Sequence, residues 1–212
     1  MRCKFKIDIK KDYKNYIKAL SNDKWKDKVP TELKRENIST YLEEKYIIEK
    51  ELIKRIVNNI NKLWFRKERE IFRRIEEVTG KKTVGNFKII LTTIKFCPYM
   101  LKTNEIMIYY LYSPEKFCEV LTHELLHFNF HQFFFEKVEE RIGTEKAHML
   151  KESVTFLINE EFQDILKEDD KGYPKHQELR KRLSDIWKSE KNFQKLVEKG
   201  TEITNTSPSF SR

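Results

Sequence analysis

The sequence predicts a helix-rich α+β fold with a small sheet. Gly and Pro, which most often interrupt helices, number only five each among 212 residues. Apolar residues recur at helical spacing over most of the chain. Short runs with strand character occur only at residues 3–9, 87–96 and 105–111. The sheet is therefore expected to be small, and the helices are expected to form most of the core.

The N-terminal region is expected to form a strand and then helices. Residues 3–9 alternate between apolar and polar side chains, as in a strand with one buried face. Further on, Thr40 and Glu43 form a capping box, which predicts the start of a helix. Apolar residues then keep helical spacing to a stop at Gly80. The stretch is long, and we expect a break near Arg66.

The middle of the chain predicts two strands followed by a buried helix. The strands are expected at Phe87–Phe96 and Glu105–Leu111. Ser113 and Pro114 then predict a helix start, because Ser is a good N-cap and Pro suits the first turn. The helix is apolar on nearly all sides as far as Phe135, so it should be buried.

Two further helices are expected in the C-terminal region. One begins at Thr144, after a glycine, and runs to about Lys167. The other runs from about Lys175 to Lys199. An Asp-Asp-Lys-Gly sequence separates them.

The length suits one domain with its own core. We assign this domain to residues 1–200, with an N-terminal helical region at about 11–80. Residues 201–212, rich in Ser and Thr, are expected to form a flexible tail.

The composition favours a cytoplasmic protein without a membrane partner. The three cysteines lack the spacing of a disulfide framework, which fits a reducing compartment. The N-terminus has no apolar segment typical of a signal peptide, and no apolar run reaches transmembrane length. The net charge is +9, but Lys and Glu are interleaved along the helices, as on solvated helix faces. Specific nucleic-acid binding is therefore not expected.

Residues 123–127, His-Glu-Leu-Leu-His, carry the strongest functional signal. His123 and His127 lie four residues apart on the predicted helix, so both imidazoles can reach one Zn²⁺ ion. Glu124 is placed to act as the general base on a water molecule at that ion. Buried imidazole and carboxylate groups are costly without partners, and a metal ion would supply them.

A catalytic zinc site needs a third protein ligand. His131 lies on the same helix but about 12 Å from His123 at 1.5 Å per residue, so the two do not easily share one ion. The other candidates downstream are His148, Glu152, Glu160, Glu161 and His176.

Glu152 on the next predicted helix is the favoured third ligand. Its face also carries His148 and Asn159, which suits a ligand with polar neighbours. Glu161 is the rival, since apolar residues flank it at helical spacing. The alternative for Glu152 itself is a surface glutamate paired with Lys151 or His148.

The His-Glu-Leu-Leu-His motif, followed by Lys151-Glu152-Ser153-Val154-Thr155 on a second helix, resembles the gluzincin metallopeptidases over about residues 87–165. The resemblance implies a zincin-like fold, with a small, mainly antiparallel sheet, an active-site helix and a glutamate helix. It also implies that the strand near 105–110 is an edge strand that pairs with an extended substrate. The ligand sequences Asn-Glu-x-x-Asp and Asn-Glu-Gly-Phe of the best-known subfamilies are absent, so no subfamily is assigned.

Further candidate catalytic residues lie between the last two predicted helices. Tyr173 and His176, with Arg180 one turn later, could each stabilise an oxyanion during attack on a carbonyl. The alternative to a catalytic role is that these residues only form the start of a helix, with Pro174 in its first turn.

The sequence therefore predicts a zinc-dependent hydrolase, a peptidase acting on a peptide or protein substrate with Glu124 as general base. One alternative is a non-catalytic, zinc-stabilised or basic helical binding protein, although such a protein has no need of Glu124. Another is a deformylase-like amidase with Cys97 as a ligand, but the Glu-Gly-Cys-Leu and Gly-x-Gly-x-Ala signatures of that family are absent.

Overall fold

The computed structural model describes residues 2–206, which divide between two compact units. The first unit comprises residues 2–68 and 85–121, and the second comprises residues 69–84 and 122–206. The length of the sequence predicts one domain. In the structure, helix α3 (Lys50–Thr79) and helix α4 (Pro114–Phe133) each contribute residues to both units.

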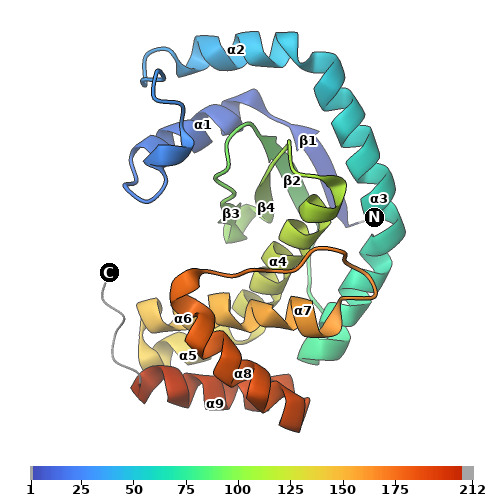
Figure 1. The fold of residues 1–212 in the computed structure, drawn as a ribbon, viewed down its shortest axis with the longest axis vertical. Helices are drawn as coiled ribbons and strands as arrows, with labels where there is room; N and C mark the ends of the chain where they lie inside the picture. The colour runs from blue at the N-terminus through green and yellow to red at the C-terminus, as the bar shows by residue number, and fades with distance from the viewer. Residues whose placement is uncertain (1, 207–212) are drawn as a thin grey trace. The chain divides into compact units, whose positions relative to one another are not determined.

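The first unit is built around a small mixed sheet (Figure 1). Its strands are β1 (Cys3–Ile7), β2 (Phe87–Thr92), β3 (Tyr99–Met100) and β4 (Glu105–Tyr109), in the order β1-β2-β4-β3. Strands β1 and β4 run parallel to β2, and β3 runs antiparallel to β4. The helix-rich α+β class is thus confirmed, but the expectation of a mainly antiparallel sheet is wrong.

Long connections explain the parallel pairing. Parallel neighbours need a crossover of about a dozen or more residues. Helices α1 (Ile9–Leu20), α2 (Ile38–Ile48) and α3 lie between β1 and β2 in the chain, with a short 3₁₀ turn at Lys26–Lys28. Sequence periodicity identifies each strand but carries no information about the direction of its neighbours.

Strand β4 lies inside the sheet, so the expectation that it is an edge strand is wrong. The 3₁₀ turn at Leu101–Thr103 ends at Asn104, whose backbone is left-handed at φ 50°. This turn folds the short strand β3 back onto β4, with Tyr99 opposite Ile106. Strands β1 and β3 are the edges instead.

The long predicted helix breaks at Glu49, not near Arg66. Helix α2 ends at Ile48 with Glu49 as its C-cap, and α3 runs through Arg66 without interruption. The Glu49 carboxylate accepts hydrogen bonds from Tyr110 Oη at 2.5 Å and Lys45 Nζ at 2.8 Å, which fixes the junction. Gly80, with φ 67°, follows the end of α3 as predicted.

Helix α4 begins as the start signal predicts. The Lys116 amide donates to Ser113 Oγ at 3.1 Å, so Ser113 caps the first turn. Leu125, Leu126 and Phe130 are at most 1% exposed, which confirms that the helix is buried. Among residues 2–206, no helix is long and apolar enough to cross a membrane.

The second unit is helical (Figure 1). After α4 it contains α5 (Phe135–Ile142), α6 (Thr144–Ser153), α7 (Leu157–Glu161), α8 (Gln177–Glu190) and α9 (Phe193–Thr206), with 3₁₀ turns η3 (Val154–Phe156) and η4 (Pro174–His176). Helix α6 packs against α5, α8 and α9. Each of the two helices predicted in this region is therefore divided in two.

The last helix continues through Gly200 to Thr206, so the predicted loosening after Gly200 is wrong for residues 201–206. A Cβ at Gly200 would lie 2.8 Å from Leu150 Cδ1 and 2.9 Å from Leu183 Cδ2. The glycine thus permits close helix packing and does not end the helix. Residues 207–212 of the predicted tail lie outside the described part of the chain.

Candidate metal centre

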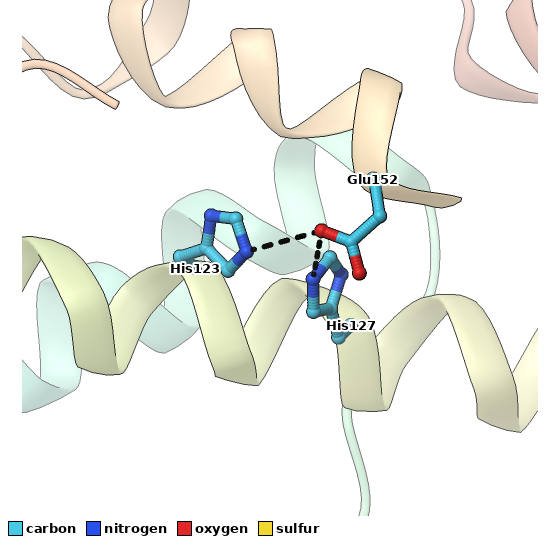
Figure 2. A group of neighbouring side chains, drawn as sticks. All are labelled: His123, His127 and Glu152. Atoms are coloured by element: carbon cyan, nitrogen blue, oxygen red, sulfur yellow. Dashed lines mark hydrogen bonds and ion pairs between the residues drawn. The ribbon is translucent and has the colours of Figure 1, made fainter. Parts of the chain in front are cut away.

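Two helices of the second unit bring together three potential metal ligands. His123 and His127 lie one turn apart on α4, and Glu152 lies near the end of α6. Figure 2 shows both imidazoles and the carboxylate pointing toward one another. The potential ligand atoms of these residues all lie within 4.8 Å of one another.

The distances fit a tetrahedral ion. Glu152 Oε2 lies 3.2 Å from His127 Nε2 and 3.7 Å from His123 Nε2. Two ligand atoms bound to zinc at about 2.0–2.1 Å with a tetrahedral angle are about 3.3 Å apart. Two imidazoles and one carboxylate also form a donor set typical of catalytic zinc. The three side chains could therefore hold a metal ion.

Asp170 fixes the other side of the His123 ring. Its Oδ1 lies 3.5 Å from His123 Nδ1, whereas Nε2 faces Glu152. A carboxylate at the second ring nitrogen sets the orientation and tautomer of an imidazole ligand. Asp170 thus holds Nε2 available for a metal.

The segment that carries Asp170 is itself held by hydrogen bonds. Asn159 and Asp170 bond reciprocally: Asn159 Nδ2 donates to the Asp170 carbonyl at 2.9 Å, and the Asp170 amide donates to Asn159 Oδ1 at 2.7 Å. The Gly172 amide donates to Asp170 Oδ1 at 3.0 Å. These bonds place the Asp170 carboxylate before any metal binds.

Arg180 on α8 completes this support. It is 5% exposed, and Nη1 donates to Asp170 Oδ2 at 3.0 Å and to Thr155 Oγ1 at 2.7 Å. Gly172 approaches it closely, since a Cβ there would lie 2.7 Å from Arg180 Nη1. The guanidinium is thus engaged in holding Asp170 and Thr155, and an oxyanion role for Arg180 remains only a prediction.

The two histidines differ in charge. Burial alone would lower the pKa of His123, but hydrogen bonds to Asp170 and Glu152 outweigh it and raise the pKa to about 10. Burial and the positive charge of Lys151 lower the pKa of His127 to about 3. At neutral pH and without metal, His123 is therefore protonated and His127 is neutral.

Glu152 and Asp170 are ionised despite their burial. Burial opposes ionisation of Glu152, but the neighbouring histidines and Lys151 hold its pKa well below the usual range. His123 and Arg180 outweigh burial in the same way and hold the pKa of Asp170 low. The centre therefore presents a negative carboxylate among its ligands without needing deprotonation.

Lys151 makes a second contact to Glu152. Its Nζ donates to Glu152 Oε1 at 2.7 Å, and its side chain is only 2% exposed. The pairing with Lys151 that a surface glutamate would make is thus present, but here Lys151 is buried and the pair lies beside the two histidines. Glu152 uses one carboxylate oxygen for Lys151 and the other for the histidines.

The other candidates for the third ligand are engaged elsewhere. Glu161 accepts hydrogen bonds from Trp187 Nε1 at 2.6 Å and Lys191 Nζ at 2.5 Å. The His148 ring lies 4.9 Å from that of Phe135. Within the described part of the chain, the potential ligand groups contain no cysteine, and Glu152 is the acidic residue grouped with both histidines.

Glu124 lies on α4 beside the first histidine. It is 8% exposed, and its negative charge contributes to the raised pKa of His123. It is therefore buried close to the candidate ligands, where a general base would be needed.

Tyr173 and His176 lie at the entry to α8. His176 is the last residue of η4 and is 4% exposed, and its ring centroid lies 5.6 Å from that of Tyr173. The turn η4 packs against α6. Among the described residues, neither belongs to a potential ligand group. Their catalytic role remains a prediction.

Sequence reasoning missed two features of this centre. The acidic sequence around Asp170 predicts only a helix break, and the sequence does not predict the burial of Lys151. The contrast between exposed Asp169 and buried Asp170 depends on how the segment packs. A charged residue next to a proposed ligand was the only sequence signal for Lys151.

Comparisons with models of protein families, with curated proteins and with solved structures found no match for this chain.

Proposed function

We propose that this chain is a zinc-dependent hydrolase, and specifically a peptidase that acts on peptide or protein substrates. One observation carries the proposal: two imidazoles from α4 and one carboxylate from α6 converge with distances of 3.2 and 3.7 Å from Glu152 Oε2. Three protein ligands leave one tetrahedral position for water or substrate, which distinguishes catalytic from structural zinc sites.

Each residue has a distinct part in this proposal. His123, His127 and Glu152 would hold Zn²⁺, and Asp170 would orient His123. When bound, the ion would supply Lewis-acid activation of a water molecule and of the scissile carbonyl. Glu124 would accept the proton of that water and pass it to the leaving amine.

The alternatives require other features. A non-catalytic zinc protein has no need of a buried carboxylate next to the first ligand, and Glu124 is such a carboxylate. The deformylase-like hypothesis requires a cysteine ligand, but the residue grouped with His123 and His127 is Glu152. The three cysteines lack the spacing of a disulfide framework, so we propose that the activity belongs to a reducing compartment.

The proposal is tested by replacing Glu124 with Gln, which keeps the shape and removes the base. Zinc content should stay near that of the unsubstituted protein, while hydrolysis of a denatured-casein peptide mixture, followed by mass spectrometry, should fall about a hundredfold or more. Glu136→Gln on α5, an exposed residue, is the matched control and should cleave normally. Unchanged cleavage by the Glu124 variant, or no cleavage of any peptide by the zinc-loaded protein, would overturn the proposal.

A further inference from the structure

We propose that Lys151 is a positioning residue for the candidate metal centre. Its buried ammonium group would hold Oε1 of Glu152, so that the carboxylate presents only Oε2 to a metal ion. This inference rests on the ligand set of the proposed function, but it does not depend on hydrolysis.

The two oxygens of Glu152 face different partners. Oε1 accepts from Lys151 Nζ at 2.7 Å. Oε2 lies 3.2 Å from His127 Nε2 and 3.7 Å from His123 Nε2. Only Oε2 is thus directed at the place where a tetrahedral ion would bind.

A change to bidentate binding would disturb the ammonium group. Lys151 is 2% exposed, so water screens its charge little. A dication bound to Oε1 would lie against this buried ammonium group and weaken its ion pair with Glu152. Oε1 is therefore expected to remain with Lys151 when metal binds through Oε2.

This arrangement has consequences for which metal is held. Three single donor atoms favour four-coordinate ions such as Zn²⁺ and Co²⁺, whereas Mn²⁺ suits octahedral sites rich in oxygen. The positive charge of Lys151 also opposes any dication at short range. Lys151 would therefore lower metal affinity somewhat and bias the centre toward tetrahedral ions.

The test replaces Lys151 with Met, which is similar in length and carries no charge. Lys146→Met is the matched control, because Lys146 lies on the same helix and donates to the Asn205 carbonyl instead. Each protein is checked for folding by circular dichroism, loaded with Co²⁺, and examined by visible absorption. Zn²⁺ and Mn²⁺ affinities are then measured by competition with a chelating dye.

In the Lys151 variant, Oε1 of Glu152 no longer bonds to an ammonium group and should also coordinate the metal ion. The visible Co²⁺ bands should weaken as the coordination number rises, and Mn²⁺ affinity relative to Zn²⁺ should rise by about tenfold, a size typical of changes next to a ligand. The Lys146 variant should match the unsubstituted protein in both measurements.

Several other outcomes would overturn the inference. An unchanged Co²⁺ spectrum with unchanged affinities would mean that Lys151 does not control Glu152. Weaker binding of every metal, or loss of folding, would mean that Lys151 supports only the helix packing. If the unsubstituted protein bound no Co²⁺ or Zn²⁺, both this inference and the proposed function would fail. Normal metal binding without peptide cleavage would overturn only the proposed function.

Discussion

The Asp170 carboxylate lies 3.5 Å from Nδ1 of His123, on the opposite side of the ring from the nitrogen that faces Glu152. This relationship joins a segment between α7 and α8 to the motif on α4. It also predicts an effect on metal binding from a residue outside the proposed ligand set of His123, His127 and Glu152.

Replacing Asp170 with Asn should weaken zinc binding by about ten- to a hundredfold, because the partner of a ligand imidazole sets its orientation and basicity. Competition with a chelating dye measures this change. Asp169→Asn is the matched control, since Asp169 is the exposed neighbour, and it should bind zinc normally. Equal affinities for the two variants would rule out the orienting role.

Glu152→Gln should reduce zinc affinity by at least ten- to a hundredfold, because Glu152 is the anionic residue in the group with His123 and His127. Even the mutation of a residue that only supports a metal ligand typically weakens metal affinity by this factor. Glu161→Gln should have little effect, since Glu161 bonds to Trp187 and Lys191. Isothermal titration with Zn²⁺ compares the two. A larger loss of zinc affinity in the Glu161 variant would indicate that Glu161, and not Glu152, is the third ligand.

Zinc binding should release about one proton at pH 8, because a ligand imidazole must be neutral. The hydrogen bonds to Asp170 and Glu152, which outweigh burial, raise the pKa of His123 to about 10, so it is protonated in the metal-free protein. His127, with a pKa of about 3, contributes no proton. Apparent zinc affinity should therefore rise with pH between 7 and 9.

Titration calorimetry in two buffers of different ionisation enthalpy counts the released protons. Zinc binding without proton release by the unsubstituted protein would contradict the assigned protonation state.

Gly172→Ala should lower both stability and zinc affinity. Gly172 has φ 58°, which strains any other residue, and its Cβ would lie 2.7 Å from Arg180 Nη1. Backbone strain of this kind costs about 1–3 kcal/mol, and displacement of Arg180 would release Asp170. Chemical denaturation and zinc titration measure the two effects.

Gly143→Ala separates the effect of backbone strain from the effect of displacing Arg180. Gly143 has φ 79°, but a Cβ there would meet no atom within 4 Å. This variant should lose stability and keep its zinc affinity. If both variants kept the affinity of the unsubstituted protein, the link from Gly172 through Arg180 to Asp170 would be wrong.

Local sequence signals predicted the parts of the site that depend on one helix. The four-residue spacing of His123 and His127 places them on one face of any α-helix, and Ser113 marks where that helix begins. Ligand chemistry favours Glu152 as the third ligand, and the structure places its carboxylate near both histidines.

The features that depend on distant packing were missed. The strand direction in the sheet, the break at Glu49 and the continuation of α9 past Gly200 are set by contacts such as Tyr110 with Glu49. Asp170 likewise reaches His123 only because Asn159 and Arg180 hold its segment. Periodicity and capping describe single elements, and such contacts lie outside them.

The most direct test of the central claim is the zinc content of protein purified without added metal. The account predicts about one Zn²⁺ per chain by elemental analysis, as a catalytic site holds. A variant with both His123 and His127 replaced by Ala should retain almost none. A matched variant with His131 and His148 replaced by Ala should keep its zinc, since neither residue belongs to a ligand group in the described part of the chain. Full zinc retention by the His123 and His127 variant would contradict the account.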